Sequence, residues 1–253
     1  MTHSATKTTL ATIPGRAHLY SANSYTTGEL LFMPANSPAT TGEALPGEPI
    51  RGGVPIIAPW FGDLTGNTPK HGWARRVEWE EQITAQSIDF RTSHDNWDIR
   101  LSAAGTADGF AMYMKVRNSS DFRRKLQLAF HPYFLVDDLT GVRVEGLPAR
   151  AGDSSPITFD GSEYDVRHRI DPDTPTTVSI VSSQRTITVT GTNSDHIVVW
   201  NPGRDHGLAD LGAEEWENFV CVEPALLGGD ETGYDTLPWE WVTFGMTVHY
   251  HLN

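Results

Sequence analysis

The chain has 253 residues, of which 32 are acidic and 19 basic, and its formal net charge at pH 7 is −13. This balance disfavours nucleic acid and anionic membranes as partners, and no stretch reaches the roughly 20 apolar residues of a membrane span. A chain of this length can bury a full core without disulfides, so the single cysteine, Cys221, implies no disulfide framework and is compatible with a reducing compartment. We therefore expect a soluble, monomeric protein of the cytoplasm.

Residues 1 to about 15 lack the continuous apolar segment of a secretory signal, and we expect a flexible N-terminal segment there. From about Leu30 onward no linker, charge block or repeat divides the chain, which predicts one domain over residues 1–253. A short helix is expected at 211–218. Alternation and β-branched or aromatic enrichment predict strands at 111–118, 124–130, 177–183, 185–191, 196–202, 218–224 and 241–252. The pattern predicts an all-β fold, a large antiparallel sandwich rather than a parallel α/β sheet.

Residues 51–63, RGGVPIIAPWFGD, combine an arginine with an unusual density of backbone constraint. Two prolines remove donors from a sheet ladder, and Gly52 and Gly53 permit conformations or close approaches that other residues cannot make. We therefore expect this segment to form the wall of a pocket and to hold Arg51 in a fixed position. In so acidic a protein, an anionic ligand requires a local cluster of arginines.

The segment HGWARRVEWE brings His71, Arg75 and Arg76 close to Arg51 in the sequence. On a strand the two adjacent arginines would face opposite ways, so only one would join Arg51. Guanidinium groups match phosphate or carboxylate with paired hydrogen bonds. We expect Arg51 and Arg75 to share an anion site, and Arg76 to form ordinary surface ion pairs.

Two predicted strands carry titratable residues on the face opposite their leucines or valines. In LQLAFHPYF, His131 and Tyr133 share that face, and in FVCVEP, Glu223 shares it with Cys221. A buried glutamate is rare unless it is paired or functional, and a histidine titrates near neutrality. Both are candidates for proton transfer, although a histidine at a strand end also commonly satisfies a backbone carbonyl.

The sequence gives little support to metal or nucleophilic chemistry. His249 and His251 share a strand face, but no third ligand accompanies them, so we expect no metal and no cofactor. There is no G-x-S-x-G elbow, and Cys221 in an apolar strand is typical of an inert core residue.

Five segments occur in the order and approximate spacing of one family: RGGVPIIAPWFG, HGWAR, AFHPYF, VVWNP and FVCVEPA. From about Arg51 to Glu223 the chain resembles the glucose-6-phosphate 1-epimerase (hexose-6-phosphate mutarotase) family of the aldose 1-epimerase superfamily. The resemblance implies a galactose-mutarotase-like β-supersandwich and an isomerase. It implies Glu223, as carboxylate, to be the catalytic base, and His131, as imidazolium, to be the catalytic acid. Further residues are implied to hold the substrate: His71 at the sugar ring, Arg51 and Arg75 at the phosphate, and Asp165 in EYDVRHRI.

Anomer exchange needs one base for the C1 hydroxyl and one acid for the ring oxygen, and the two exchange roles on ring closure. The expected substrate is a hexose 6-phosphate, and glucose 6-phosphate is the expected example. Two alternatives stay open: a catalytically silent carbohydrate-binding protein on the same scaffold, and an aldose 1-epimerase acting on unphosphorylated sugars.

Overall fold

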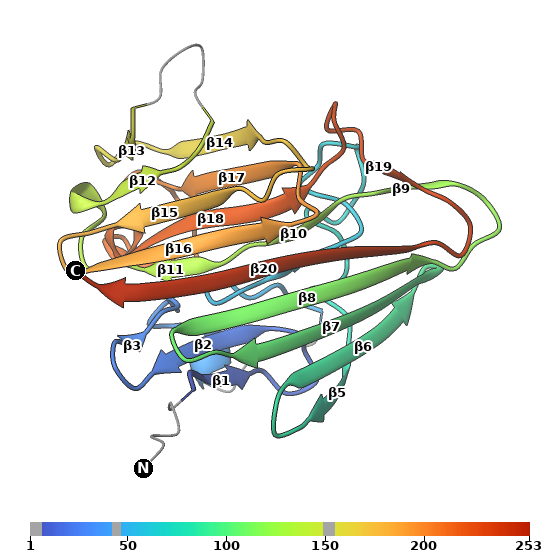
Figure 1. Ribbon diagram of the computed structural model, residues 1–253, viewed down its shortest axis with the longest axis horizontal. Coiled ribbons are helices and arrows are strands. Elements are labelled where there is room, and N and C mark those ends of the chain that lie inside the picture. The colour runs from blue at the N-terminus through green and yellow to red at the C-terminus, as the bar shows by residue number, and fades with distance from the viewer. Residues whose placement is uncertain (1–6, 42–46, 149–154) are drawn as a thin grey trace.

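The computed structural model describes residues 7–41, 47–148 and 155–253. Within these ranges the chain is built from antiparallel strands with little helix, so the predicted all-β fold is confirmed (Figure 1). All seven predicted strands are present, and residues 215–218 of the expected short helix form a 3-10 turn, η2 (Glu215–Asn218). No helix among the described residues is long and apolar enough to cross a membrane.

The larger sheet has nine strands in the order β13-β12-β15-β16-β20-β8-β7-β6-β5. Figure 1 shows it running from β13 at one edge to β5 at the other. Its strands are β5 (Glu80–Ile83), β6 (Ile88–His94), β7 (Trp97–Gly105), β8 (Gly109–Asn118), β12 (Arg143–Glu145), β13 (Ile157–Thr158), β15 (Thr177–Val181), β16 (Arg185–Thr192) and β20 (Trp241–Leu252).

The second sheet has six strands, with the order β14-β17-β18-β10-β4 and with β11 also paired to β18. Its strands are β4 (Ile56–Ile57), β10 (Leu128–Phe130), β11 (Tyr133–Leu135), β14 (Tyr164–Arg169), β17 (His196–Asn201) and β18 (Phe219–Leu226). Every residue of β18 is buried, as expected for a central strand covered on both faces.

Two smaller sheets and three short turns of helix complete the described chain. The elements are β1 (Thr9–Thr12), β2 (Leu19–Ser24) and β3 (Gly28–Glu29) in one sheet, β9 (Arg124–Leu126) and β19 (Tyr234–Thr236) in the other, α1 (Pro38–Thr41), η1 (Leu139–Gly141) and η2. Strand β1, whose backbone pairs with β2 over Thr9 to Thr12, lies within residues 1 to about 15, where a flexible segment is expected. Residues 1–6 of that segment lie outside the described residues.

The main core lies between the two large sheets. Inward-facing residues of β8 and β20 pack against β10, β17 and β18; the ring of Phe244, for example, lies 5.2 Å from that of Phe130 between centroids. Alternation along β18 is the reason: Val220 and Val222 face this core, whereas Cys221 faces the opposite side. The six-stranded sheet therefore has one face in the main core, and a site can form on its other face, which smaller apolar clusters partly cover.

The predicted strand 124–130 is divided at Gln127, and the division positions the site. The Gln127 side chain accepts a hydrogen bond from the backbone of Phe61 (2.9 Å) and donates to the carbonyl oxygen of Glu231 (2.8 Å). Before it the chain pairs with β19, and after it with β18. A second break, at His131 and Pro132, separates β10 from β11 on the same partner strand.

Candidate active site

The second face of the six-stranded sheet lines a cavity of about 410 Å³, within the usual size range of small-molecule sites. Strands β11, β14, β17 and β18 supply its floor, and the loops before β4, after β4 and after β17 supply its rim. All six residues that the sequence indicated line this one cavity: Arg51, His71, Arg75, His131, Asp165 and Glu223.

Glu223 lies at the centre of the cavity floor, on β18 and paired with Val198 of β17. Only 1% of its side chain is exposed. One carboxyl oxygen, Oε1, lies 3.4 Å from Nε2 of His131, and the other, Oε2, is buried without a hydrogen-bond partner. Burial, reinforced by the nearby charge of Asp165, raises the pKa of Glu223 well above its usual value. Burial therefore acts against the carboxylate form of Glu223.

His131 is held by the break between β10 and β11. Its backbone N–H donates to the carbonyl oxygen of Pro55 (3.1 Å), and its ring stacks on that of Tyr133, with centroids 4.9 Å apart and planes at 10°. The edge of the Trp200 ring closes another side at 5.7 Å. Burial, followed by the nearby charges of His71 and Arg75, lowers the pKa of His131 well below its usual value.

Burial of both groups acts against the imidazolium and the carboxylate that the resemblance implies. An imidazolium beside a carboxylate and a neutral imidazole beside a carboxylic acid have the same total number of protons and the same net charge. In either form the pair has one proton that can pass between the ring and the carboxyl group.

His71 presents a defined face to the cavity. Its Nδ1 accepts a hydrogen bond from the backbone N–H of Gly62 (3.2 Å), so the ring proton lies on Nε2. Its backbone has a φ of 66°, and its N–H donates to the Gly62 carbonyl oxygen (2.9 Å). Burial, with Arg75, Lys70 and Arg51 nearby, lowers its pKa to about 3. His71 is therefore a neutral residue that can donate a hydrogen bond to a ligand.

Arg51 is fixed on three sides, as the constraint around it predicted. Its Nε donates to Asp210 (2.9 Å), its Nη1 donates to the Tyr133 hydroxyl (3.2 Å), and its guanidinium lies 5.8 Å from the centre of the Trp200 ring. The neighbouring Gly52 has a φ of 87°, and a Cβ there would lie 2.8 Å from the Phe32 carbonyl oxygen. Glycine at position 52 therefore allows the backbone next to Arg51 to pack closely against the backbone of Phe32, which fixes the loop that carries the arginine.

Arg75 joins Arg51 in the cavity, but the structural reason differs from the one expected. Residues 71–76 form turns rather than a strand, so alternation does not separate the two adjacent arginines. Arg75 lines the cavity and donates to the Lys70 carbonyl oxygen (2.9 Å), whereas Arg76 donates to that of Gly47 (2.9 Å) outside it. Burial, followed by the charges of Arg76 and Arg51, lowers the pKa of Arg75 to about 10, against the opposing effect of Tyr133.

Asp165 enters the cavity from β14, where it pairs with Trp200 of β17. Two residues along the same strand face, Arg167 also lines the cavity and is held by Glu231 at 2.9 Å. Strand alternation after Asp165 could have located Arg167, to which the sequence analysis assigned no role.

Other lining residues also had no assigned role: Lys70, Tyr133, Trp200 and Asp210. Tyr133 and Trp200 lie within two motifs already noted, AFHPYF and VVWNP, and alternation from His131 placed Tyr133 on the same face. Asp210 had no sequence signal, because its place depends on a loop fixed from a distance. The buried Asn201 holds that loop: its amide nitrogen donates to the carbonyl oxygens of Trp216 and Phe219, both at 2.9 Å.

Comparison with solved structures identifies the fold. The crystal structure described as a "putative mutarotase (YeaD)" from Salmonella typhimurium has a TM-score of 0.75 and 22% identity, over 94% of this chain and 85% of that one. That of a "galactose mutarotase related enzyme" from Lactobacillus acidophilus has a TM-score of 0.72 and 15% identity, over 97% of both chains. The expected galactose-mutarotase-like fold is confirmed.

The sequence gives the family. Residues 17–232 match the model of the family described as "Aldose 1-epimerase", and the chain belongs to that family. Two relatives share the name "Putative glucose-6-phosphate 1-epimerase". The protein from Cenchrus ciliaris is 29% identical over 72% of this chain, which spans 65% of that relative's length. The protein from Salmonella typhimurium strain LT2 is 28% identical over 82% of this chain and 76% of its own. The family agrees with the isomerase class that the motifs indicated.

Proposed function

We propose that the chain interconverts the α and β anomers of a hexose 6-phosphate, with glucose 6-phosphate as the type substrate. The observation that carries this proposal is the pair formed by His131 Nε2 and Glu223 Oε1, 3.4 Å apart at the floor of a cavity that also holds Arg51 and Arg75. The family supports the reaction, and the names of the two relatives support the phosphorylated substrate.

The reaction needs two proton transfers at neighbouring oxygens of the sugar. A base removes the proton of the C1 hydroxyl while an acid protonates the ring oxygen; the bond between C1 and that oxygen breaks, and the C1 aldehyde forms. Rotation about the C1–C2 bond presents the other face of the aldehyde, and ring closure returns both protons. Positioned acid and base groups typically contribute about 10² to 10⁴-fold each.

A pair that holds one proton has the stoichiometry that this cycle requires. Glu223 acts as base and His131 as acid once the shared proton has moved from the carboxyl to Nε2, a transfer that their 3.4 Å separation supports. Such contacts are often long in an empty site and shorten when substrate binds. Ring closure then uses the same two groups in exchanged roles.

We place the substrate phosphate at Arg51 and Arg75. Both guanidinium groups line the cavity together with His71, and after burial both contribute to the lowered pKa of His71. The Nε of Arg75 is buried without a hydrogen-bond partner, so a bound oxyanion would satisfy it. His71 and Asp165 are then available to the sugar hydroxyls through the Nε2–H donor and the carboxylate acceptors.

The test is NMR exchange spectroscopy of the two anomeric protons, on glucose 6-phosphate and on glucose, with and without protein. We expect catalysed exchange that is faster with the phosphorylated sugar. Binding without faster exchange would identify a carbohydrate-binding protein, and equal acceleration of both sugars would identify an epimerase of unphosphorylated aldoses. The monomeric state and the cytoplasmic location stay predictions from the sequence.

A further inference from the structure

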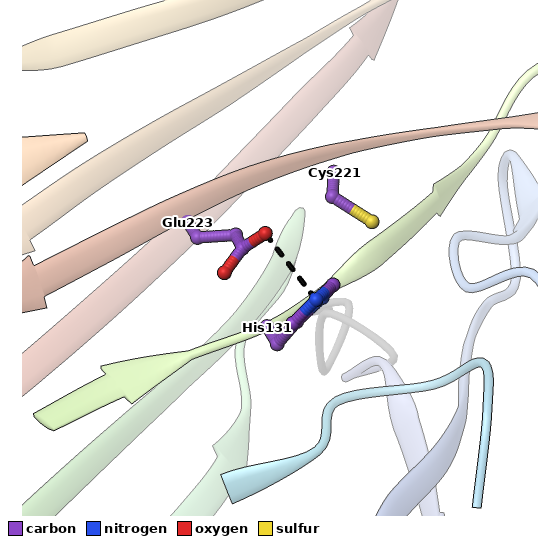
Figure 2. A group of neighbouring side chains, drawn as sticks. All are labelled: His131, Cys221 and Glu223. Atoms are coloured by element: carbon purple, nitrogen blue, oxygen red, sulfur yellow. Dashed lines mark ion pairs between the residues drawn. The ribbon is translucent and has the colours of Figure 1, made fainter. Parts of the chain in front are cut away.

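The thiol of Cys221 lies beside the acid–base pair in a position that proton transfer does not use. The ligand atoms of His131, Cys221 and Glu223 all lie within 4.8 Å of one another, and all three residues are buried. Figure 2 shows the three side chains around a common space. Within the part of the chain that the structure describes, this is the cluster of histidine, cysteine and carboxylate groups with a spacing suited to a metal ion.

The sheet builds this arrangement. Cys221 and Glu223 are two residues apart on β18 and so project from the same face, away from the core valines. The backbone of Cys221 pairs with Tyr133 of β11, whose ring stacks on His131. Two of the three groups are thus fixed by strand pairing and the third by ring stacking, and none depends on an exposed loop.

The spacing of the nitrogen and oxygen atoms fits a tetrahedral zinc ion. Zinc bonds of about 2.0–2.1 Å to histidine nitrogen and carboxylate oxygen, at tetrahedral angles, separate the two ligand atoms by about 3.3 Å. Nε2 of His131 and Oε1 of Glu223 are 3.4 Å apart. A zinc–sulfur bond of about 2.3 Å requires the Cys221 sulfur within about 3.6 Å of both ligand atoms. The three ligand atoms lie within 4.8 Å of one another, so binding requires the sulfur to move closer by at most about 1.2 Å.

An unsatisfied carboxyl oxygen provides a second, independent indication of a ligand. Oε2 of Glu223 is buried without a hydrogen-bond partner, and the glutamate side chain is 1% exposed. A buried polar atom without a partner carries a cost that an ion or a donor in the site would relieve. One thiol, one imidazole and one carboxylate form a donor set for zinc or cadmium, whereas magnesium and calcium prefer oxygen ligands alone.

We propose that His131, Cys221 and Glu223 bind a thiophilic divalent cation such as zinc. Binding of this ion inhibits the enzyme. The ion enters from the cavity, which His131 and Glu223 line, and the thiol behind them supplies the third ligand. The fourth position faces the cavity and is left to water. Binding replaces the thiol proton and the shared proton of the pair with bonds to the metal.

Inhibition follows from the identity of the ligand atoms, and to that extent it rests on the proposed function. A lone pair of Nε2 or Oε1 that is bound to zinc cannot take or deliver a proton, so a metal-loaded site cannot open the sugar ring. The ion and the sugar also occupy the same end of the cavity. Zinc should therefore raise the apparent KM for the sugar, and saturating zinc should abolish exchange.

The experiment measures binding and activity separately. Cadmium is titrated into the metal-free protein, and thiolate-to-cadmium charge-transfer absorption reports a Cys221 bond whether or not the protein is an enzyme. Zinc affinity is measured by calorimetry, and anomer exchange is followed at each zinc concentration. Cys221→Ala removes the thiol and leaves the acid–base pair in place. His249→Ala is the matched control, because His249 and Asp108 form an exposed pair, 3.1 Å apart, on the other sheet.

We expect one equivalent of cadmium to produce the absorption band in the wild type and in His249→Ala, and no band in Cys221→Ala. Zinc affinity should fall more than about 100-fold in Cys221→Ala. Loss of a residue that only hydrogen-bonds to a metal ligand already lowers metal affinity by about 10- to 100-fold, and loss of a ligand itself should lower it further. Metal-free exchange by Cys221→Ala should stay within about twofold of wild type. Equal zinc affinity in Cys221→Ala and wild type, or a loss of binding in His249→Ala, overturns the site. Binding without any catalysed exchange overturns the proposed function and leaves the site intact.

Discussion

Nε2 of His131 and Oε1 of Glu223 lie 3.4 Å apart, although one residue follows β10 and the other lies at the middle of β18. Because β10 and β11 both pair with β18, the break between them faces the carboxylate directly. The pairing of these strands thus joins two titratable groups at the floor of the cavity.

Removing either member of this pair should abolish most anomer exchange. Glu223→Gln keeps the size of the side chain and deletes the proton-transfer group. His131→Asn deletes the proposed acid and leaves a smaller, polar side chain. We expect exchange rates lower by about 10² to 10⁴-fold in each variant. Circular dichroism and thermal unfolding should show a folded protein in both. Exchange at the wild-type rate in either variant would remove that residue from the mechanism.

Chelation should leave activity unchanged or raise it. The proton transfers at His131 and Glu223 need no Lewis acid, and any zinc held with Cys221 occupies the same two atoms. Exchange is measured before and after exhaustive dialysis against a chelator, and again after zinc is restored. If activity is lost on chelation and one metal restores it, the metal is a cofactor and the mechanism above is wrong.

The sequence predicted the parts of the site that depend on a single strand or motif. Alternation in FVCVEP placed Glu223 beside Cys221 and away from the valines, and the structure agrees. It could not predict Asp210, which reaches Arg51 from a distant loop, nor the effect of burial on the pKa values of His131 and Glu223. Both depend on what surrounds a residue in three dimensions, which a strand pattern does not contain.

Asp195 should make the protein sensitive to acid. Its carboxylate accepts hydrogen bonds from the backbone N–H groups of Leu227 and Gly228 and from His196, each at 2.8 Å. Although burial opposes ionisation, these donors lower its pKa. A lowered folded-state pKa stabilises the protein above the unfolded value of about 3.9, and this stabilisation is lost as pH falls through the folded-state pKa.

Asp195→Asn should accordingly reduce the free energy of unfolding at pH 7 by about 1.5–3 kcal/mol. Denaturant unfolding of wild type and variant is compared from pH 7 down to pH 3. Arg167, His196 and Glu231 are present in both proteins, so the difference reports the carboxylate together with its contact to His196. The difference in free energy of unfolding between wild type and variant should become smaller as the pH falls. A difference that does not depend on pH would mean that Asp195 contributes only through packing.

Gly53→Ala should strongly destabilise the fold. Gly53 has a φ of 61°, and a Cβ would fall on the carbonyl oxygen of Leu19. Its own N–H and C=O bind the backbones of Phe32 (2.8 Å) and Tyr133 (2.9 Å), so the loop cannot move aside freely. We expect a loss of about 2–5 kcal/mol in unfolding free energy. Gly66→Ala is the control, because its φ of 71° is similar but nothing lies within 4 Å of the new Cβ; it should cost about 1–2 kcal/mol.

Arg51 and Arg75 should determine the preference for a phosphorylated sugar. If both bind the C6 phosphate, replacing either with alanine removes charge-assisted hydrogen bonds of about 1.5–3 kcal/mol, or roughly ten- to a hundredfold in kcat/KM for glucose 6-phosphate. Glucose lacks the phosphate, so activity on glucose should hardly change and the preference should collapse. Arg76→Ala is the matched control: Arg76 is the next residue in the chain, but it donates to the carbonyl oxygen of Gly47 outside the cavity, and both activities should be retained.

The comparison of the two sugars separates recognition from structural support. Both arginines also make internal contacts, Arg51 with Asp210 and Tyr133, and Arg75 with Lys70. Loss of those contacts alone would loosen the cavity wall and lower activity on both sugars by the same factor, with a lower unfolding temperature. A selective loss with glucose 6-phosphate, at an unchanged unfolding temperature, requires that the guanidinium groups bind the phosphate. Equal losses on the two sugars would mean that the phosphate binds elsewhere and that the two arginines only support the pocket.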